Sequence, residues 1–112
     1  MKRVVVSGLG IISSLGNNKD EVRESLQQAK SGISFAKEYQ DLGLRSHVYG
    51  NVKLDEKKLI ERKPLRFMGQ AAAFAYLAMK EAITDAKLTA ENISNEKTGL
   101  IVGSGGSSNA DI

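Results

Sequence analysis

The chain has 112 residues, a length that suits one domain or a piece of a larger one. With 41% hydrophobic and 26% charged residues, its composition is typical of a folded globular protein. The net charge of +3 and the few aromatic residues argue against a nucleic acid partner. Because there is no cysteine and only one histidine, a disulfide, a cysteine nucleophile and a Cys- or His-based metal site are excluded within this chain. We expect no metal and no cofactor.

The N-terminal segment "KRVVVSGLGIISSLGNN" has features of a signal peptide, because Lys2 and Arg3 precede a mostly apolar stretch. However, glycines interrupt this stretch and no A-x-A cleavage site follows it. No part of the chain reaches the roughly eighteen consecutive apolar residues of a membrane span. We therefore expect a mature cytoplasmic protein without a membrane partner.

Two short apolar segments are predicted to be strands. Val4–Val6 is a β-branched run bounded by glycine, which is typical of a strand buried on both faces in a parallel sheet. Leu100–Val102 repeats this pattern and also leads into a glycine-rich loop.

A first helix is predicted to begin near Asn18, because Asn17 and Asn18 are good N-cap residues and acids follow in the first turn. Its apolar stripe has helical spacing: Val22, Leu26 and Ala29. Ser31 and Gly32 are expected to end it. Ile33–Leu44 is predicted to be irregular, and Arg45–Val52 to be extended and on the surface.

A second helix is predicted over Gly69–Lys87. Every residue from Ala71 to Met79 is apolar, so this half of the helix must be covered on all sides, while the second half is amphipathic and reaches water. Two strands, one peripheral helix and one buried helix do not close a core. We therefore expect an incomplete α/β fold, either a fragment of a larger protein, which we favour, or a chain completed by a partner.

The Gly8-x-Gly10 turn after the first strand raises the question of a dinucleotide site. The third small residue of the G-x-G-x-x-G fingerprint is replaced by Ser13, and no acid for a ribose lies in 31–35. Close packing or a turn is the favoured role for these glycines. A serine nucleophile is also disfavoured, because neither Ser104 nor Ser107 stands in a G-x-S-x-G motif. His47 has no neighbouring acid or nucleophile and is interpreted as a structural or surface residue.

The segment 53–66 is the most basic part of the chain, with six Lys or Arg residues against three acids. If it is helical, Arg62 and Arg66 share one face and Lys63 lies beside them. Two interpretations stay open: a solvated surface, or a docking patch for an acidic partner.

Five segments, in this order and at this spacing, resemble the N-terminal part of the type I 3-oxoacyl-[acyl-carrier-protein] synthases, a family of bacterial condensing enzymes. They are "KRVVVSGLGIISSLGNN", "SGIS", "RSHVYGNVKLD", "LIERKPLRFM" and "GLIVGSGG". The resemblance covers essentially residues 1–112, which would form an N-terminal, incomplete segment of a ketoacyl synthase domain.

The resemblance implies a thiolase-like, five-layered αβαβα fold in a cytoplasmic homodimer. The reaction it implies transfers an acyl group from acyl carrier protein to a cysteine and condenses it with malonyl carrier protein through decarboxylation. The family's catalytic cysteine, two histidines and lysine do not match residues of this chain, so we expect no catalytic residue here and no activity of the chain alone.

Binding residues do match. The resemblance implies that the acidic carrier protein meets four basic residues: Arg45, Arg62, Lys63 and Arg66. It also implies that Gly105 and Gly106 belong to the loop beside the acyl pocket and the dimer interface. Ser107 and Ser108 follow where glycine and serine stand in the family. The alternative hypothesis, from another functional class, is a self-standing, non-catalytic module that binds an acidic protein through 53–66.

Overall fold

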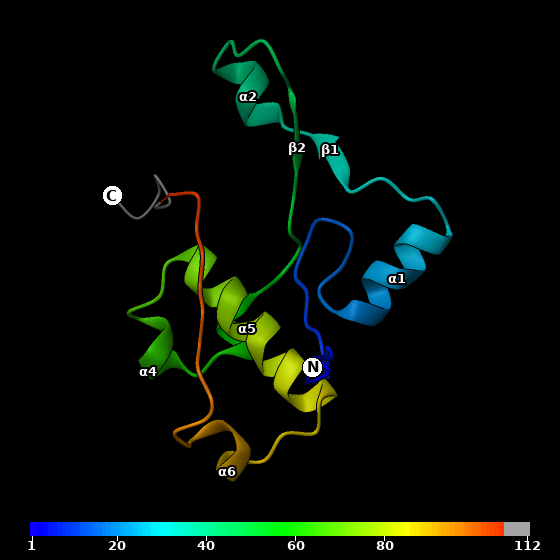
Figure 1. Cartoon of the computed structure of the whole chain (residues 1–112). Coiled ribbons are helices and arrows are strands. Elements are labelled where there is room, and N and C mark those ends of the chain that lie inside the picture. The colour runs from blue at the N-terminus through cyan, green and yellow to red at the C-terminus, as the bar shows by residue number, and fades with distance from the viewer. Residues whose placement is uncertain (107–112) are drawn as a thin grey trace. The chain divides into compact units, whose positions relative to one another are not determined.

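The computed structural model describes residues 1–106 of the chain (Figure 1). The chain divides into two compact units. One unit is continuous and spans Ile11–Asp55. The other combines Met1–Gly10 with Glu56–Ile112.

The unit Ile11–Asp55 contains two helices and a small antiparallel sheet. In chain order its elements are α1 (Lys19–Gln27), β1 (Ile33–Phe35), α2 (Lys37–Asp41) and β2 (Val48–Gly50). In the sheet, Ile33 lies opposite Gly50 and Phe35 opposite Val48. The extended segment predicted within Arg45–Val52 is confirmed by β2. The prediction that Ile33–Leu44 is irregular is wrong, because this segment forms β1, which pairs with β2, and the short helix α2.

Helix α1 begins where the sequence predicts. The Asn18 side chain caps it, its Oδ1 accepting from the backbone N–H groups of Asp20 at 3.1 Å and Glu21 at 3.0 Å. Of the predicted stripe, Val22 is buried, whereas Leu26 is exposed. The predicted end at Ser31 is wrong, since the helix stops at Gln27 and Ala29 turns left-handed with a φ of 51°.

The other unit is helical in its described part. Its elements are α3 (Glu56–Leu59), α4 (Arg62–Leu65), α5 (Gln70–Asp85) and α6 (Ala90–Ile93). Helix α6 begins with a capping box formed by Thr89 and Asn92. Among residues 1–106, no helix has both the length and the apolar character needed to cross a membrane.

Helix α5 confirms the predicted helix over 69–87 to within two residues at either end. The predicted cover on all sides is not present in this chain, where Ala73 is the buried residue of α5 with 1% exposure, and Tyr76 and Met79 remain exposed. Full cover of α5 therefore stays a prediction for a larger protein.

The Gly8-x-Gly10 turn packs against α5, which confirms the packing role predicted for these glycines. A Cβ atom on Gly10 would overlap the backbone carbonyl of Ala78, and one on Gly8 would lie 2.5 Å from the carbonyl oxygen of Ala82. Between them, the N–H of Leu9 donates to the Asp85 carboxylate at 3.1 Å. Only glycine allows the backbone to come this close to the helix.

The two predicted strands are not formed. Val4–Val6 and Leu100–Val102 carry no strand hydrogen bonding, and their side chains are largely exposed, with Val4 at 93% and Ile101 at 97%. A β-strand needs a neighbour to complete its hydrogen bonds, and the described part of the chain pairs neither segment with one. In residues 1–106 the sheet consists of β1 and β2.

Three helices end in the same way. After α1, the N–H of Lys30 donates to the backbone carbonyl of Ser25, and the N–H of Ala29 donates to the backbone carbonyl of Leu26. These two hydrogen bonds define a Schellman motif. Two further residues take the left-handed position that Ala29 has after α1. They are Lys87 after α5, with a φ of 55°, and Gly43 after α2, with a φ of 69°. Thus one of the three positions has the glycine that this geometry favours.

Candidate functional site

The basic residues singled out from the sequence lie on a tight helical turn. Arg62, Lys63 and Arg66, which we call the basic turn, belong to α4 and its C-cap, and all three are exposed. The N–H of Arg66 donates to the carbonyl of Arg62 at 3.3 Å, so these two residues stand one turn apart. The shared face predicted for them, with Lys63 adjacent, is consistent with this backbone.

The segment 53–66 is not one continuous helix. Helix α3 ends at Leu59, and Ile60 and Glu61 separate it from α4. Ile60 is buried at 4% exposure, so the break is anchored by an apolar side chain while the charged residues on either side stay at the surface. This arrangement presents the positive charges of two short helices rather than one charged helical stripe.

A surface hollow lies at the basic turn. It has a volume of about 420 Å³ and is lined by Lys57 of α3, by Arg62 and Leu65 of α4, and by Arg66. The Arg66 guanidinium also lies 6.0 Å from the ring centroid of Phe67, within the range of a cation–π contact. The site thus combines positive charge with apolar surface, and the sequence pattern indicated the charge alone.

The other predicted site residues are placed elsewhere. Arg45 is exposed in the unit Ile11–Asp55, between α2 and β2. Gly105 and Gly106 are exposed near the end of the described residues, where the Ser104 hydroxyl donates to the carbonyl of Gly106 at 2.8 Å. Ser107 and Ser108 lie outside the described residues.

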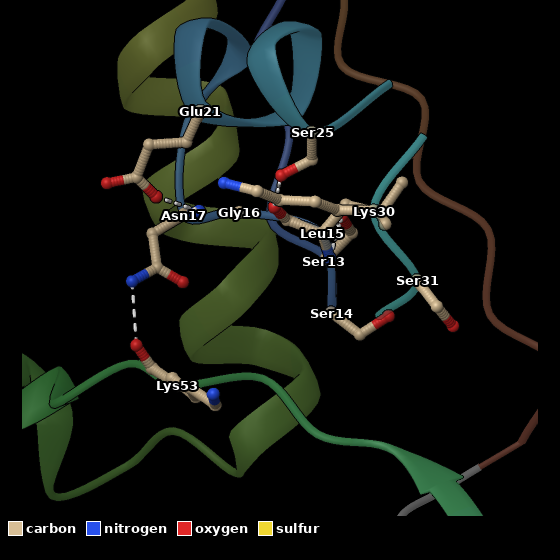
Figure 2. A pocket seen from close by; sticks show the side chains of 10 residues that line it. All are labelled: Ser13, Ser14, Leu15, Gly16, Asn17, Glu21, Ser25, Lys30, Ser31 and Lys53. Atoms are coloured by element: carbon tan, nitrogen blue, oxygen red, sulfur yellow. Dashed lines mark hydrogen bonds between the residues drawn. The ribbon is translucent and has the colours of Figure 1, made fainter. Parts of the chain in front are cut away.

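A second hollow, which the sequence analysis missed, lies within the unit Ile11–Asp55 (Figure 2). It has a volume of about 260 Å³, and most of the residues that line it are polar. The lining residues are Ser13, Ser14, Leu15, Gly16, Asn17, Glu21, Ser25, Lys30, Ser31 and Lys53. The only signal in the sequence was the density of small polar residues in "SSLGNN", which is also typical of an ordinary loop.

Several polar groups of this second hollow hold the chain to itself. The Ser25 hydroxyl donates to the carbonyl of Leu15 at 2.7 Å. Asn17 donates twice, from its backbone N–H to the Glu21 carboxylate and from its side-chain amide to the carbonyl of Lys53, both at 2.7 Å (Figure 2). These bonds tie the loop before α1 to the helix and to the segment after β2, which is a structural role.

Within the described range 1–106, no cluster of three His, Asp or Glu side chains is placed to hold a metal ion. The His47 ring packs edge-on against Phe35, with 6.2 Å between the ring centroids. This ring contact agrees with the structural or surface role predicted for His47. The exposed charges of the basic turn suit the binding of an acidic partner.

Comparison with known proteins assigns the chain to a family. The model of the beta-ketoacyl synthase N-terminal domain matches residues 1–112. The chain is 54% identical to 3-oxoacyl-[acyl-carrier-protein] synthase 1 of Haemophilus influenzae over 105 residues, which are 94% of this chain and 26% of that protein. It is 55% identical to the protein of the same name from Escherichia coli K12 over 109 residues, which are 96% of this chain and 27% of that protein.

A third relative is the 3-oxoacyl-[acyl-carrier-protein] synthase 1 of Buchnera aphidicola subsp. Baizongia pistaciae. It is 58% identical over 106 residues, which are 93% of this chain and 26% of that protein. The chain thus spans about a quarter of the length of these relatives. The family implies a thiolase-like α/β fold, in agreement with the predicted fold class. The match over all its residues shows that the chain belongs to the beta-ketoacyl synthase family, in the N-terminal domain of that family.

Proposed function

We propose that the chain is the N-terminal segment of a 3-oxoacyl-[acyl-carrier-protein] synthase that elongates fatty acids. The main support for this proposal is sequence identity. More than half of the aligned residues are identical to relatives with that name, along nearly the whole length of the chain. In the complete enzyme the segment contributes to a five-layered αβαβα fold and to a cytoplasmic homodimer. Gly105 and Gly106 lie in the loop beside the acyl pocket and the dimer interface.

The proposed reaction has two stages. A cysteine thiolate displaces carrier protein from its acyl thioester and becomes acylated. Malonyl carrier protein then loses carbon dioxide, and the resulting carbanion attacks the acyl group and expels the thiolate, which forms the new carbon–carbon bond. The cysteine of this chemistry belongs to another part of the enzyme, because this chain has none. The family resemblance implies that the two histidines and the lysine also lie outside this segment.

The role of this segment is to recruit the carrier protein. The basic turn is exposed, and its three positive charges face solvent without an intervening acid among residues 62–66. Acyl carrier proteins are strongly acidic, so Arg62, Lys63 and Arg66 steer and hold them, and Arg45 adds a further positive charge. Exposed ion pairs contribute about 0.2–1 kcal/mol each, so several together give weak, reversible docking.

Charge reversal of the basic turn in the full-length enzyme tests this role. Changing Arg62, Lys63 and Arg66 to Glu should raise the Michaelis constant for carrier-bound substrate about tenfold or more, because three attractions become repulsions. It should also flatten the dependence of that constant on salt, since less attraction is left to screen. Condensation of a small carrier-free thioester serves as the reference reaction.

A matched control changes three exposed basic residues from other elements, Arg23, Lys37 and Lys97, to Glu. This variant has the same net charge as the first, so it should retain the Michaelis constant for carrier-bound substrate unless docking depends on total charge. Equal loss with both substrates in the Arg62, Lys63 and Arg66 variant would show that the basic turn is structural. No loss with either substrate would show that it is only a solvated surface.

A further inference from the structure

Leu65 lies between two hollows at the surface of the helical unit. It lines the hollow of about 420 Å³ together with Lys57, Arg62 and Arg66. It also lines a smaller hollow of about 220 Å³, whose other walls include Met68 and the first residues of α5. Leu65 itself is only half-buried, so part of an apolar side chain faces open space beside the basic residues.

The fold holds Leu65 firmly in this position. Its N–H donates to the carbonyl of Glu61 at 3.1 Å, and its own carbonyl accepts from the N–H of Met68 at 3.1 Å. The buried Ile60 anchors the chain immediately before this turn. The apolar site is therefore presented on an ordered backbone and not on a loop.

The basic and apolar side chains around the larger hollow indicate which kind of partner can bind there. Lys57, Arg62 and Arg66 border the larger hollow, and Leu65 supplies its apolar wall. Carboxylates alone would satisfy the positive border and leave the apolar wall in water. A protein surface that presents one apolar side chain among carboxylates satisfies both, since the apolar group leaves water in the hollow while the acids meet the basic residues.

We propose that Leu65 is an apolar anchor point for the carrier protein, which inserts one apolar side chain of its acidic surface into the hollow beside α4. This inference rests on the proposed function, because it takes the carrier protein as the partner of the basic turn. It adds an apolar contact whose strength does not depend on salt, in contrast to the ion pairs around it. Leu65 then accounts for part of the binding that survives at high ionic strength.

The test measures the dissociation constant of the carrier protein for the full-length enzyme at low and high salt. Leu65→Ala should weaken binding roughly three- to tenfold at both salt concentrations, as expected for truncating a central apolar contact. Leu65→Met, which keeps the volume and apolar character, should bind within about twofold of the wild type. Arg62→Gln should weaken binding at low salt and much less at high salt.

A second arm identifies the inserted group. Exposed apolar residues of the carrier protein are replaced by alanine one at a time, and each is paired with wild-type enzyme and with Leu65→Ala. The inserting residue should cost affinity with the wild type and little further affinity with Leu65→Ala, because the two substitutions remove the same contact. Unfolding midpoints of all enzyme variants check that each is folded.

The outcomes separate this inference from the proposed function. If Leu65→Ala binds as tightly as the wild type while the charge variants bind weakly, the apolar anchor is wrong and carrier docking at the basic turn stands. If charge variants and Leu65→Ala all bind normally, docking at the basic turn is itself wrong. If Leu65→Ala lowers the unfolding midpoint and Leu65→Met also binds weakly, Leu65 is structural and the inference is overturned.

Discussion

The two glycines of the Gly8-x-Gly10 turn show how far a single residue type can be interpreted from sequence. The missing third glycine and the missing ribose acid argued against a nucleotide site, and packing was favoured instead. The structure confirms packing and identifies the contact, which is the backbone of α5 at Ala78 and Ala82. The sequence could not name this contact, because it joins residues about seventy positions apart that only the folded chain brings together.

This contact predicts that a substitution at Gly10 destabilises the protein much more than one at Gly99. Gly10→Ala should lower the free energy of unfolding of the full-length enzyme by about 1–3 kcal/mol, since the added methyl group meets helix backbone that cannot move aside. Gly99→Ala is the matched control, because a Cβ there meets nothing within 4 Å. Urea unfolding of both variants is the measurement, and equal midpoints would contradict the packing role.

Helices and strands differ in how well the sequence predicted them. The start of α1 at the Asn18 cap and nearly the whole of α5 were predicted, because caps and long apolar runs are local signals. The segments Val4–Val6 and Leu100–Val102 carry the composition of strands but form none, since strand formation depends on a partner that local sequence does not contain. Conversely, β1 was missed because its pairing with β2 outweighs its weak local pattern.

The all-apolar half of α5 gives a prediction at this scale. In the full-length enzyme, Ala73→Lys should cost several kcal/mol, because it places an unpaired charge among packed side chains. Ala75→Lys should cost a similar amount, although Ala75 is exposed in this chain, if α5 is covered on all sides in the complete protein. Thr84→Lys, on the amphipathic half, is the control and should change the unfolding midpoint little.

Ala75 is the informative position of this set. A midpoint unchanged by Ala75→Lys would show that α5 keeps one open face in the complete enzyme. A midpoint unchanged by Ala73→Lys as well would refute burial of the helix altogether.

The buried hydrophobic residues in the described part of the chain are Val22, Ala36, Ile60 and Ala73, two in each unit. Such small clusters contribute too little apolar burial to offset the loss of chain entropy on folding.

The isolated 112-residue chain should therefore show neither a cooperative thermal unfolding transition nor condensing activity. Circular dichroism over a temperature ramp tests the first, and incubation with acyl and malonyl carrier protein, analysed for 3-oxoacyl product, tests the second. We expect no activity because the covalent acyl transfer of the proposed reaction needs a thiolate, and the chain has no cysteine.

A sharp transition at a midpoint independent of chain concentration would instead favour the alternative of a self-standing binding module. Product above a blank without protein would contradict the role of the cysteine in the proposed reaction.

The candidate site was predictable to the extent that it depends on charge and helical spacing. Arg62, Lys63 and Arg66 were singled out from a run of basic residues, and the structure places them on one exposed turn. The apolar wall at Leu65 was not predicted, because a leucine in a short basic helix has no distinctive pattern. Its position in a hollow depends on how α3, α4 and the start of α5 come together, which is tertiary information.

The left-handed helix ends bear on how this segment can vary among its relatives. At Ala29 and Lys87 the Schellman geometry is maintained by hydrogen bonds of the main chain, which any residue can make, while the side chains contribute only an unfavourable torsion. Replacement by glycine or asparagine at these two sites would relieve that torsion and leave the path of the backbone unchanged. Glycine and asparagine are therefore the replacements that residues 29 and 87 accept most readily, whereas a β-branched residue at either position would strain the turn.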